Sequence, residues 1–252
     1  MKSNYALVRN VPNTYDHCVT KQQEKIDVTL AKQQHADYCN ALEKIGLQLI
    51  RLEADDSLPD CCFVEDTAIA VDDIAIITNP GAISRRAEVA AVEKEISKYK
   101  TIHRIDAPAT IDGGDVLQIG KKIFIGLSER TTQEAIDQVQ EIVRSKGFEV
   151  IGVPIHHTLH LKSVATALTD SQIILNAAHF DEALFSGLRK IIVPEQEHYA
   201  ANCLAVNETI FIPSGFPVTK SLIEGAGFST VELENSEFKK GDGALTCLSI
   251  LF

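Results

Sequence analysis

A repeated pattern of strand, polar turn, strand and helix is the feature that most constrains the fold of this chain. Four stretches pair two apolar strands across a tight polar turn, and we expect the turns at Asp72-Asp73, Lys121-Lys122, Asp170-Ser171 and Asn207-Glu208. The residues that lead the units recur about every 45 positions, and they are Asp66, Asp112, His160, Asn202 and Cys247. A period of this length indicates one supersecondary unit stacked in a ring or an array.

Helical patterns follow the hairpins and lead into further apolar strands. The clearest spans 131–147, where Thr131 and Glu134 form a capping-box pair and Gly147 ends the apolar periodicity. We expect further helices within 84–100, 181–189 and 219–227. A complete unit therefore reads strand, strand, helix, strand.

The fifth unit is incomplete at Phe252. An apolar strand at 5–11 and a helical pattern at 28–46 supply what this unit lacks, which would close the chain into a circle. A closed ring leaves no sheet edge exposed. We therefore expect an α/β fold, a five-bladed α/β propeller with pseudo-fivefold repeats. Because no linker divides the chain, residues 1–252 should form a single catalytic domain.

Composition narrows the classes of function. The chain carries 24 Lys and Arg against 35 Asp and Glu, a net charge of −11, which argues against nucleic acid and suits a cationic small molecule. No apolar run approaches the roughly 18 residues of a membrane span, and the first residues lack a signal-peptide pattern, so we expect a cytoplasmic protein without membrane contact. The six cysteines form no CxxC pair, which favours core thiols over disulfides.

A ring would bring the leading residues together at one end of its axis, and Cys247 is the most reactive of them. This cysteine could be a core residue, a metal ligand or a nucleophile, and its leading position beside a glycine-containing loop favours the nucleophile. His156 and His160 are four residues apart, but the glutamate of an HExxH motif is missing, which makes a zinc site a poor interpretation. His160 is either a structural histidine or a catalytic one, and we expect His156 and His157 in a loop.

Charged residues near the leading positions indicate a zwitterionic ligand. Three carboxylates fall within seven residues, Asp60, Glu65 and Asp66, and they form either a solvated acidic loop or a site for a cation. Arg85 and Arg130 open helical segments at equivalent places in successive units, and arginine can clamp a carboxylate with two hydrogen bonds. Acids together with paired arginines point to an amino acid of the arginine kind. The Gly113-Gly114 turn after Asp112 should let the backbone approach a ligand closely.

Seven motifs, in order between about Tyr5 and Phe252, are SLPDCCFVED, PGAISRRAEV, IDGGDV, IGLSERT, LHLKS, AANCLAVN and DGALTCLSI. Together they resemble the dimethylarginine dimethylaminohydrolases of the guanidino-modifying (pentein) superfamily. The resemblance implies a fivefold α/β propeller, the fold that the period also predicts. It implies hydrolysis of asymmetric dimethylarginine or monomethylarginine to citrulline and dimethylamine or methylamine. The reaction would pass through a covalent cysteine thiouronium, with no cofactor and no metal.

The resemblance also carries functional roles onto matching positions. Cys247 would be the nucleophile, His160 the general acid and base, and Asp112 the third catalytic acid, where some relatives have glutamate. The residues that would contact the substrate are Glu65 and Asp66 at the guanidinium, Asp60 at the α-amino group, Arg85 and Arg130 at the α-carboxylate, and Gly241, whose backbone carbonyl would accept from the amino group. Since Gly241 would act through its backbone, its side chain should be immaterial.

The segment 12–22, PNTYDHCVTKQ, departs from the family pattern. The family places here a lid loop with a leucine whose backbone contacts the substrate, and the loop in this chain is shorter. Val19 is the nearest match, with Cys18 and Thr20 as alternatives.

Other functions remain open at the level of sequence. Arginine deiminases share the mechanism but carry His-x-Asp where this chain has His160-Leu161-Lys162, and a lysine there favours a methylated guanidinium. An amidinotransferase is a second alternative. A third is a silent binding protein, like the ribosome anti-association factor of this fold, although the retained cysteine, histidine and acid argue against it. Zinc could bind Cys247 and His160 as an inhibitor. A monomer and a homodimer both fit the sequence.

Overall fold

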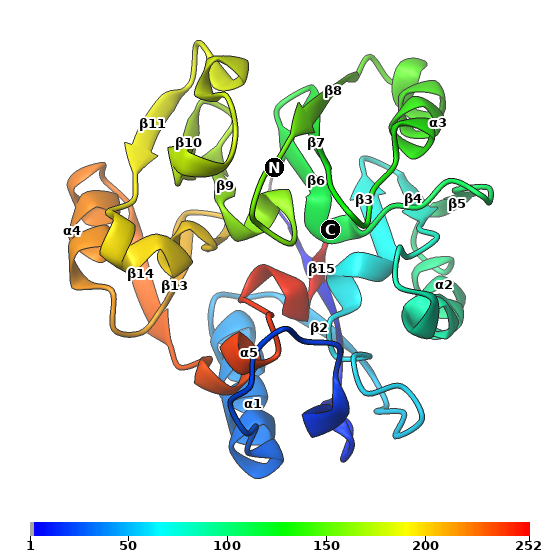
Figure 1. Ribbon diagram of the computed structural model, residues 1–252, viewed down its shortest axis with the longest axis horizontal. Coiled ribbons are helices and arrows are strands. Elements are labelled where there is room, and N and C mark those ends of the chain that lie inside the picture. Colours follow the sequence, from blue (N-terminus) through cyan, green and yellow to red (C-terminus); the bar gives the residue numbers. More distant parts are fainter. Residues whose placement is uncertain (1–2) are drawn as a thin grey trace.

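The structure, a computed structural model that describes residues 3–252, is a ring of five small β-sheets around a central axis (Figure 1). From the axis outward the sheets are β15-β1-β2, β3-β4-β5, β6-β7-β8, β9-β10-β11 and β12-β13-β14. In each sheet the inner strand is antiparallel to the middle strand, and the outer strand is parallel to it. The predicted five-bladed α/β propeller is confirmed.

The elements have the following bounds. The strands are β1 (Tyr5–Arg9), β2 (Gln48–Leu52), β3 (Ala68–Val71), β4 (Ile74–Ile77), β5 (Thr101–Arg104), β6 (Val116–Ile119), β7 (Lys122–Leu127), β8 (Glu149–Pro154), β9 (Ala165–Thr169), β10 (Gln172–Leu175), β11 (Arg189–Ile192), β12 (Leu204–Val206), β13 (Thr209–Pro213), β14 (Ser229–Leu233) and β15 (Ile250–Leu251). The α-helices are α1 (Val28–Lys44), α2 (Val89–Ile96), α3 (Gln133–Arg144), α4 (Pro217–Gly225) and α5 (Ser236–Lys240).

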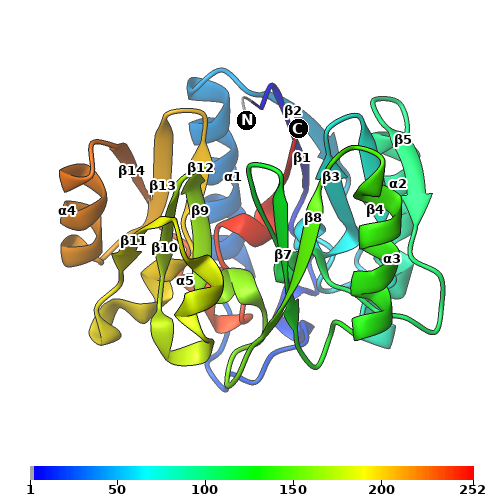
Figure 2. The ribbon, with the colours of Figure 1, turned by 90° about the horizontal axis from the view of Figure 1, so that it is seen from above.

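Four helices cover the outer side of the ring (Figures 1 and 2). Helices α1 to α4 each connect a middle strand to the parallel outer strand of the same sheet, as parallel pairing requires. The helix expected within 181–189 is wrong, since only the 3-10 turn Glu182–Phe185 forms there. Ser186 is extended and Gly187 has a left-handed φ of +86°, which together end the turn.

The middle strands are buried on both faces, which explains their unbroken apolar sequences. Successive side chains of a strand point to opposite faces. In β4, Ile74 and Ile76 pack against β7 and α3, whereas Ala75 and Ile77 pack against β1. The same alternation in the other middle strands builds five apolar clusters, each between two neighbouring blades. Along the axis runs a cavity, lined mainly by apolar residues of the inner strands together with a few polar ones such as Glu65 and Lys162.

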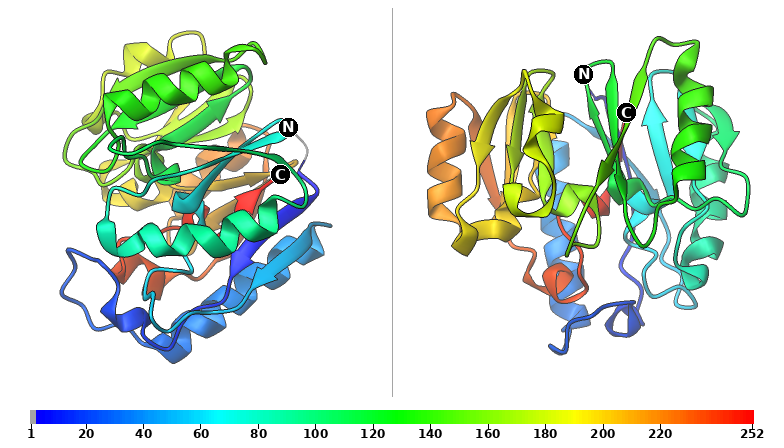
Figure 3. Two further views of the ribbon diagram at one scale, coloured as in Figure 1. Left: turned by 90° about the vertical axis from the view of Figure 1, so that its right-hand side faces the viewer. Right: turned by 45° about the horizontal axis from the view of Figure 1, so that its top comes forward.

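The ring closes where the two ends of the chain meet (Figure 3). Strand β15 pairs antiparallel with β1, with Ala6 opposite Leu251 and Leu7 opposite Ile250. The N–H groups of Asn4 and Tyr5 both donate to the carbonyl of Phe252. The N-terminal strand and helix therefore complete the fifth blade, as predicted.

Two local predictions need correction. The second hairpin turns at Gly120-Lys121, because Lys122 already belongs to β7 and Gly120 supplies a left-handed φ of +58°. The cap of α3 is Thr132, whose hydroxyl accepts from the N–H of Ala135. The hydroxyl of Thr131 is used elsewhere, since it donates to the buried carboxylate of Asp115 and accepts from the N–H of Asp112.

The six cysteines are all free. Within residues 3–252, none of the helices combines the length and the apolar character needed to cross a membrane.

Candidate active site

Short 3-10 turns bring the leading residues of the units to one end of the axis. The turns Val64–Thr67, Gly113–Asp115, Leu161–Ser163 and Thr246–Leu248 begin four of the blades. A pocket of about 20 Å³ lies between them, lined by Val19, Asp60, Phe63, Asp66, Arg85, Arg130, Leu159, His160, Gly241, Asp242, Gly243 and Cys247. Eight of the ten predicted site residues line this pocket. Asp112 lies buried behind His160, and Glu65 lines a separate cavity on the axis.

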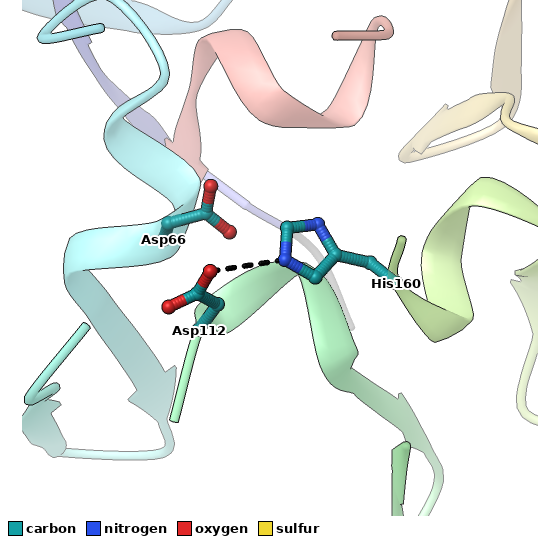
Figure 4. A group of neighbouring side chains, drawn as sticks. All are labelled: Asp66, Asp112 and His160. Atoms are coloured by element: carbon teal, nitrogen blue, oxygen red, sulfur yellow. Dashed lines mark hydrogen bonds and ion pairs between the residues drawn. The ribbon is translucent and has the colours of Figure 1, made fainter. Parts of the chain in front are cut away.

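His160 is held by Asp112 among acidic neighbours (Figure 4). Its Nε2 lies 3.0 Å from Asp112 Oδ2, while Asp112 Oδ1 accepts from the N–H of Gly81 at 2.9 Å. Burial alone would lower the pKa of His160, but Asp66, Asp112 and Asp115 outweigh burial and raise the pKa to about 9. His160 is therefore an imidazolium at neutral pH and can donate a proton.

Cys247 is partly exposed in the pocket and is a thiol in the empty site. Burial, and then the charges of Glu65 and Asp66, raise the pKa of this thiol above its ordinary value. The pKa of Asp66 itself lies well below the ordinary range, because the cations of His160 and Arg85 outweigh its burial. The site is thus acidic, and its thiol is neutral.

The glycines after Asp112 are required by the packing of the site. A Cβ on Gly114 would lie 2.6 Å from His160 Nδ1, and one on Gly113 would overlap the carbonyl oxygen of Glu65. The N–H of Gly114 donates to Asp66 Oδ1 at 2.8 Å. The close approach predicted for this turn is therefore made to protein groups.

Three residues of the site could be taken for a metal centre. Asp66, Asp112 and His160 are the one group in residues 3–252 whose ligand atoms lie within 4.8 Å of one another (Figure 4). Arg85 pairs with Asp66 at 2.5 Å and Arg130 with Asp112 at 3.3 Å. An imidazolium has no lone pair for a metal, so this donor set suits a cationic substrate better.

The two predicted clamp arginines differ in how free they are. Arg130 lines the pocket, and its one ion pair within residues 3–252 is with Asp112. Arg85 is buried, and its guanidinium donates to Asp66, to Glu88 and to the carbonyl of Phe63. Burial raises the pKa of Glu88 to about 7, although Arg85 counteracts part of this rise. Arg130 is therefore the more available partner for a substrate carboxylate.

The lid segment lies closed over the pocket. The N–H of Val19 donates to both carboxylate oxygens of Asp60, at 3.0 and 3.2 Å. Asp242 accepts from the backbone N–H of Lys21 at 2.7 Å and from the Thr20 hydroxyl at 2.9 Å. Because the remaining volume holds little more than a water molecule, the lid must move before an amino acid can enter.

The expectation that the side chain at position 241 is immaterial is wrong. A Cβ on Gly241 would lie 2.5 Å from Tyr15 Oη and 3.1 Å from Cys18 Sγ. Tyr15 and Cys18 belong to the lid, so a larger residue here would push the lid away from the pocket.

Glu65 is tied to Lys162 below the pocket. Lys162 Nζ lies 2.5 Å from Glu65 Oε1, and the hydroxyl of Thr246 donates to Glu65 Oε2 at 2.8 Å. Both oxygens of Glu65 thus already hold protein donors.

Sequence reasoning missed three acids that support the site, Glu88, Asp115 and Asp242. Glu88 could have been found, since it lies three residues after Arg85 on a helical pattern. Asp115 is the second acid of DGGD. It accepts from the N–H of Leu161 at 2.9 Å and so fixes the residue that follows His160. Asp242 could not be predicted from a local pattern, because its hydrogen-bond partners in the lid lie 220 to 222 residues away in the sequence.

Known proteins resemble this chain in sequence and in structure. A family model described as arginine deiminase matches residues 55–186. An N(G),N(G)-dimethylarginine dimethylaminohydrolase of Streptomyces coelicolor is 36% identical over 99% of this chain and 97% of its own. The enzyme of that name from Pseudomonas aeruginosa is 34% identical over 90% of this chain and 91% of its own. A crystal structure of the Pseudomonas enzyme, a cysteine-to-serine variant complexed with citrulline, is 31% identical, covers all of both chains and superimposes with a TM-score of 0.97.

Proposed function

The chain belongs to the dimethylarginine dimethylaminohydrolase family, and we propose that it hydrolyses Nω-methylated arginine through Cys247, His160 and Asp112. The products are citrulline and dimethylamine or methylamine. The observation that carries the proposal is the meeting of Cys247 with an imidazolium and a ring of carboxylates in one lidded pocket.

Substrate binding uses the charges at the pocket. Asp66 faces the guanidinium, and each of its oxygens can accept a further hydrogen bond beyond those from Gly114 and Arg85. Asp60 and the carbonyl of Gly241 take the α-amino group beneath the lid residue Val19. Arg130, with the buried Arg85 beside it, takes the α-carboxylate.

The first half of the reaction forms a covalent adduct. A guanidinium cation beside Cys247 lowers the pKa of its thiol, so the proton is released to water as the substrate binds. The thiolate attacks the planar guanidinium carbon. His160, oriented through Nε2 by Asp112, gives a proton to the departing methylamine, which leaves a thiouronium on Cys247.

The second half releases citrulline. His160 is now neutral and takes a proton from a water molecule, which attacks the thiouronium carbon. The carbon–sulfur bond breaks, and the leaving thiolate takes the hydroxyl proton of the adduct, which gives neutral citrulline and restores the thiol of Cys247. His160 is again an imidazolium, ready for the next cycle.

An arginine deiminase is the second candidate, since the matching family model carries that description. The Lys162–Glu65 pair favours the methylated substrate. An unmethylated guanidinium has one more N–H than the monomethylated and two more than the asymmetric dimethylated one. Glu65 is no ready acceptor for them, because it lines the axial cavity rather than the pocket and its charge is paired with Lys162. We therefore place arginine as the poorer substrate.

The proposal includes a cytoplasmic location, without nucleic acid or membrane as partner. Free cysteines, such as the buried Cys61-Cys62 pair, are typical of a reducing compartment. A homodimer is not required for the chemistry, because every residue named above comes from one chain.

The test is citrulline release from asymmetric dimethylarginine, monomethylarginine and arginine, with wild type and Cys247→Ser side by side. We expect turnover of the methylated substrates, less of arginine, and none above background for Cys247→Ser. Preferred turnover of arginine would overturn the interpretation of Lys162. Turnover by folded Cys247→Ser would overturn the mechanism.

A further inference from the structure

We propose that Asn202 positions the nucleophile, because its side-chain amide caps the turn of Cys247 and ties this turn to the segment of His160. The inference rests on the function proposed above, since it takes Cys247 as the nucleophile. Among the five leading residues of the repeat, Asn202 is the one that the mechanism leaves without a role. Its side chain is almost fully buried, at 2% exposure.

The turn that carries Cys247 takes its cap from another blade. This turn, Thr246–Leu248, follows Leu245, whose side chain makes no capping hydrogen bond. The first N–H groups of a helical turn have no partner within the turn. The N–H of Thr246 donates instead to Asn202 Oδ1 at 3.2 Å. Since Thr246 is buried, loss of this acceptor would leave its N–H unpaired.

The amide nitrogen of Asn202 binds the backbone segment that follows His160, the proposed general acid. Asn202 Nδ2 donates to the carbonyl of Lys162 at 2.8 Å and lies 3.0 Å from Thr246 Oγ1. Lys162 belongs to the short turn that starts directly after His160. One rigid amide therefore sets the distance between the backbone segments of nucleophile and acid.

This amide is part of a closed circuit of interactions among four residues. The hydroxyl of Thr246 donates to Glu65, Glu65 pairs with Lys162, and the backbone of Lys162 returns to Asn202. These four residues enter four different blades. The circuit thus connects segments that are joined by no common sheet.

Behind the circuit lies open space. A cavity of about 240 Å³ runs along the axis, lined by Glu65, Lys162 and Thr246 and by the inner strands of all five sheets. Leu245 and Leu248 anchor this turn in an apolar cluster on one side. Thr246 lines the cavity on the other side and is held there by polar bonds to Asn202 and Glu65. A displacement of about 1 Å at a reacting group can lower the rate about a hundredfold.

The test measures kcat and KM of Asn202→Ala with asymmetric dimethylarginine, together with citrulline binding. We expect kcat to fall about 10- to 100-fold, with KM and the citrulline Kd within about threefold, because the clamp residues stand on other segments. Asn176→Ala is the matched control. Asn176 holds only the N–H of Ala178, outside the pocket, and its loss should leave kcat unchanged.

Asn202→Asp separates positioning from a structural role. A protonated carboxyl can donate to the carbonyl of Lys162 as the amide does, whereas an ionised one cannot. We expect the ratio of its kcat to that of wild type to rise as the pH falls. A ratio that is flat with pH, or a kcat of folded Asn202→Ala within about threefold of wild type, would overturn the inference. If Asn202→Ala does not fold, the pH dependence of this ratio decides alone.

Cys247→Ser, assayed in parallel, keeps the two proposals apart. Turnover by wild type and none by Cys247→Ser supports the proposed function whatever Asn202 does. Turnover by Cys247→Ser would remove the nucleophile that Asn202 is inferred to position.

Discussion

Burial and the nearby carboxylates keep Cys247 protonated in the empty site, and carboxylates keep His160 protonated in spite of its burial. Negative charge favours the imidazolium of His160 and disfavours the thiolate of Cys247. In the empty site His160 is therefore able to donate a proton, whereas the thiol of Cys247 is unreactive. A cationic substrate supplies the charge that activates Cys247, which restricts reaction to cations that fit the pocket.

The pH dependence of the acid follows from this arrangement. The pKa of His160 is raised from 6.5 to about 9, so its proton is present at neutral pH and is lost as the pH rises through about 9. We expect kcat/KM to fall above that pH. An NMR titration of the His160 ring in Cys247→Ser measures the same event without turnover. Titration of this ring near pH 6.5 would contradict the prediction.

At the scale of elements, helix α1 shows how burial and charge decide stability. Asp27 caps α1 by accepting from the N–H groups of Thr29 and Leu30. The helix presents Ala31, His35, Tyr38 and Leu42 to the core. His35 Nε2 finds no hydrogen-bond partner among residues 3–252, and burial lowers the pKa of this ring to about 4.

His35 should make the fold sensitive to acid. Because its pKa is lower in the folded chain, the unfolded chain binds the proton first, and stability falls as the pH drops from 6.5 towards 4. At about 1.4 kcal/mol for each pH unit, His35 accounts for a loss of about 3 kcal/mol in the free energy of unfolding. Urea unfolding of His35→Leu from pH 7 to 4.5 should show a shallower decline than wild type.

The exposed His17 provides the control for this measurement. His17→Gln should keep the slope of wild type. Equal slopes for His35→Leu and wild type would show that His35 is not the group that titrates.

At the scale of the whole molecule, the ring is closed by the pairing of β15 with β1, which we call the seam. Strand β15 contributes only two residues, yet it pairs with β1 to complete the fifth blade and packs against the next blade. Five cores arranged in a circle depend on one another, because opening one of them frees two blades. The seam should therefore affect the stability of the entire fold.

Ile250 tests the seam. It is 5% exposed in the cluster shared by β1 and β4, and Ile250→Ala should lower the free energy of unfolding by about 2–5 kcal/mol. Unfolding should stay a single transition with an unchanged urea dependence. Leu222→Ala, on the exposed face of α4, should change stability by about 0.5 kcal/mol at most. Equal effects of the two substitutions would contradict a role for the seam.

The sequence by itself determined the ring, because five apolar middle strands at a regular period can be buried on both faces only between neighbours. It also placed Cys247 and His160 at equivalent positions of that period. The position of the second hairpin turn, at Gly120, and the cap of α3, at Thr132, were each predicted one residue away. Short-range sequence signals can shift by one position without changing the overall pattern.

Only the tertiary structure determined which residues of the site are paired with one another. The partners of Lys162 and Asn202, and the Asp66 partner of Arg85, come from other turns or other blades, and no local pattern encodes such pairs. Protonation was also decided there, since the pKa of His160 depends on three acids that meet it only in the closed ring. Periodicity fixes which residues arrive at the axis, whereas distance and burial fix what each of them can do.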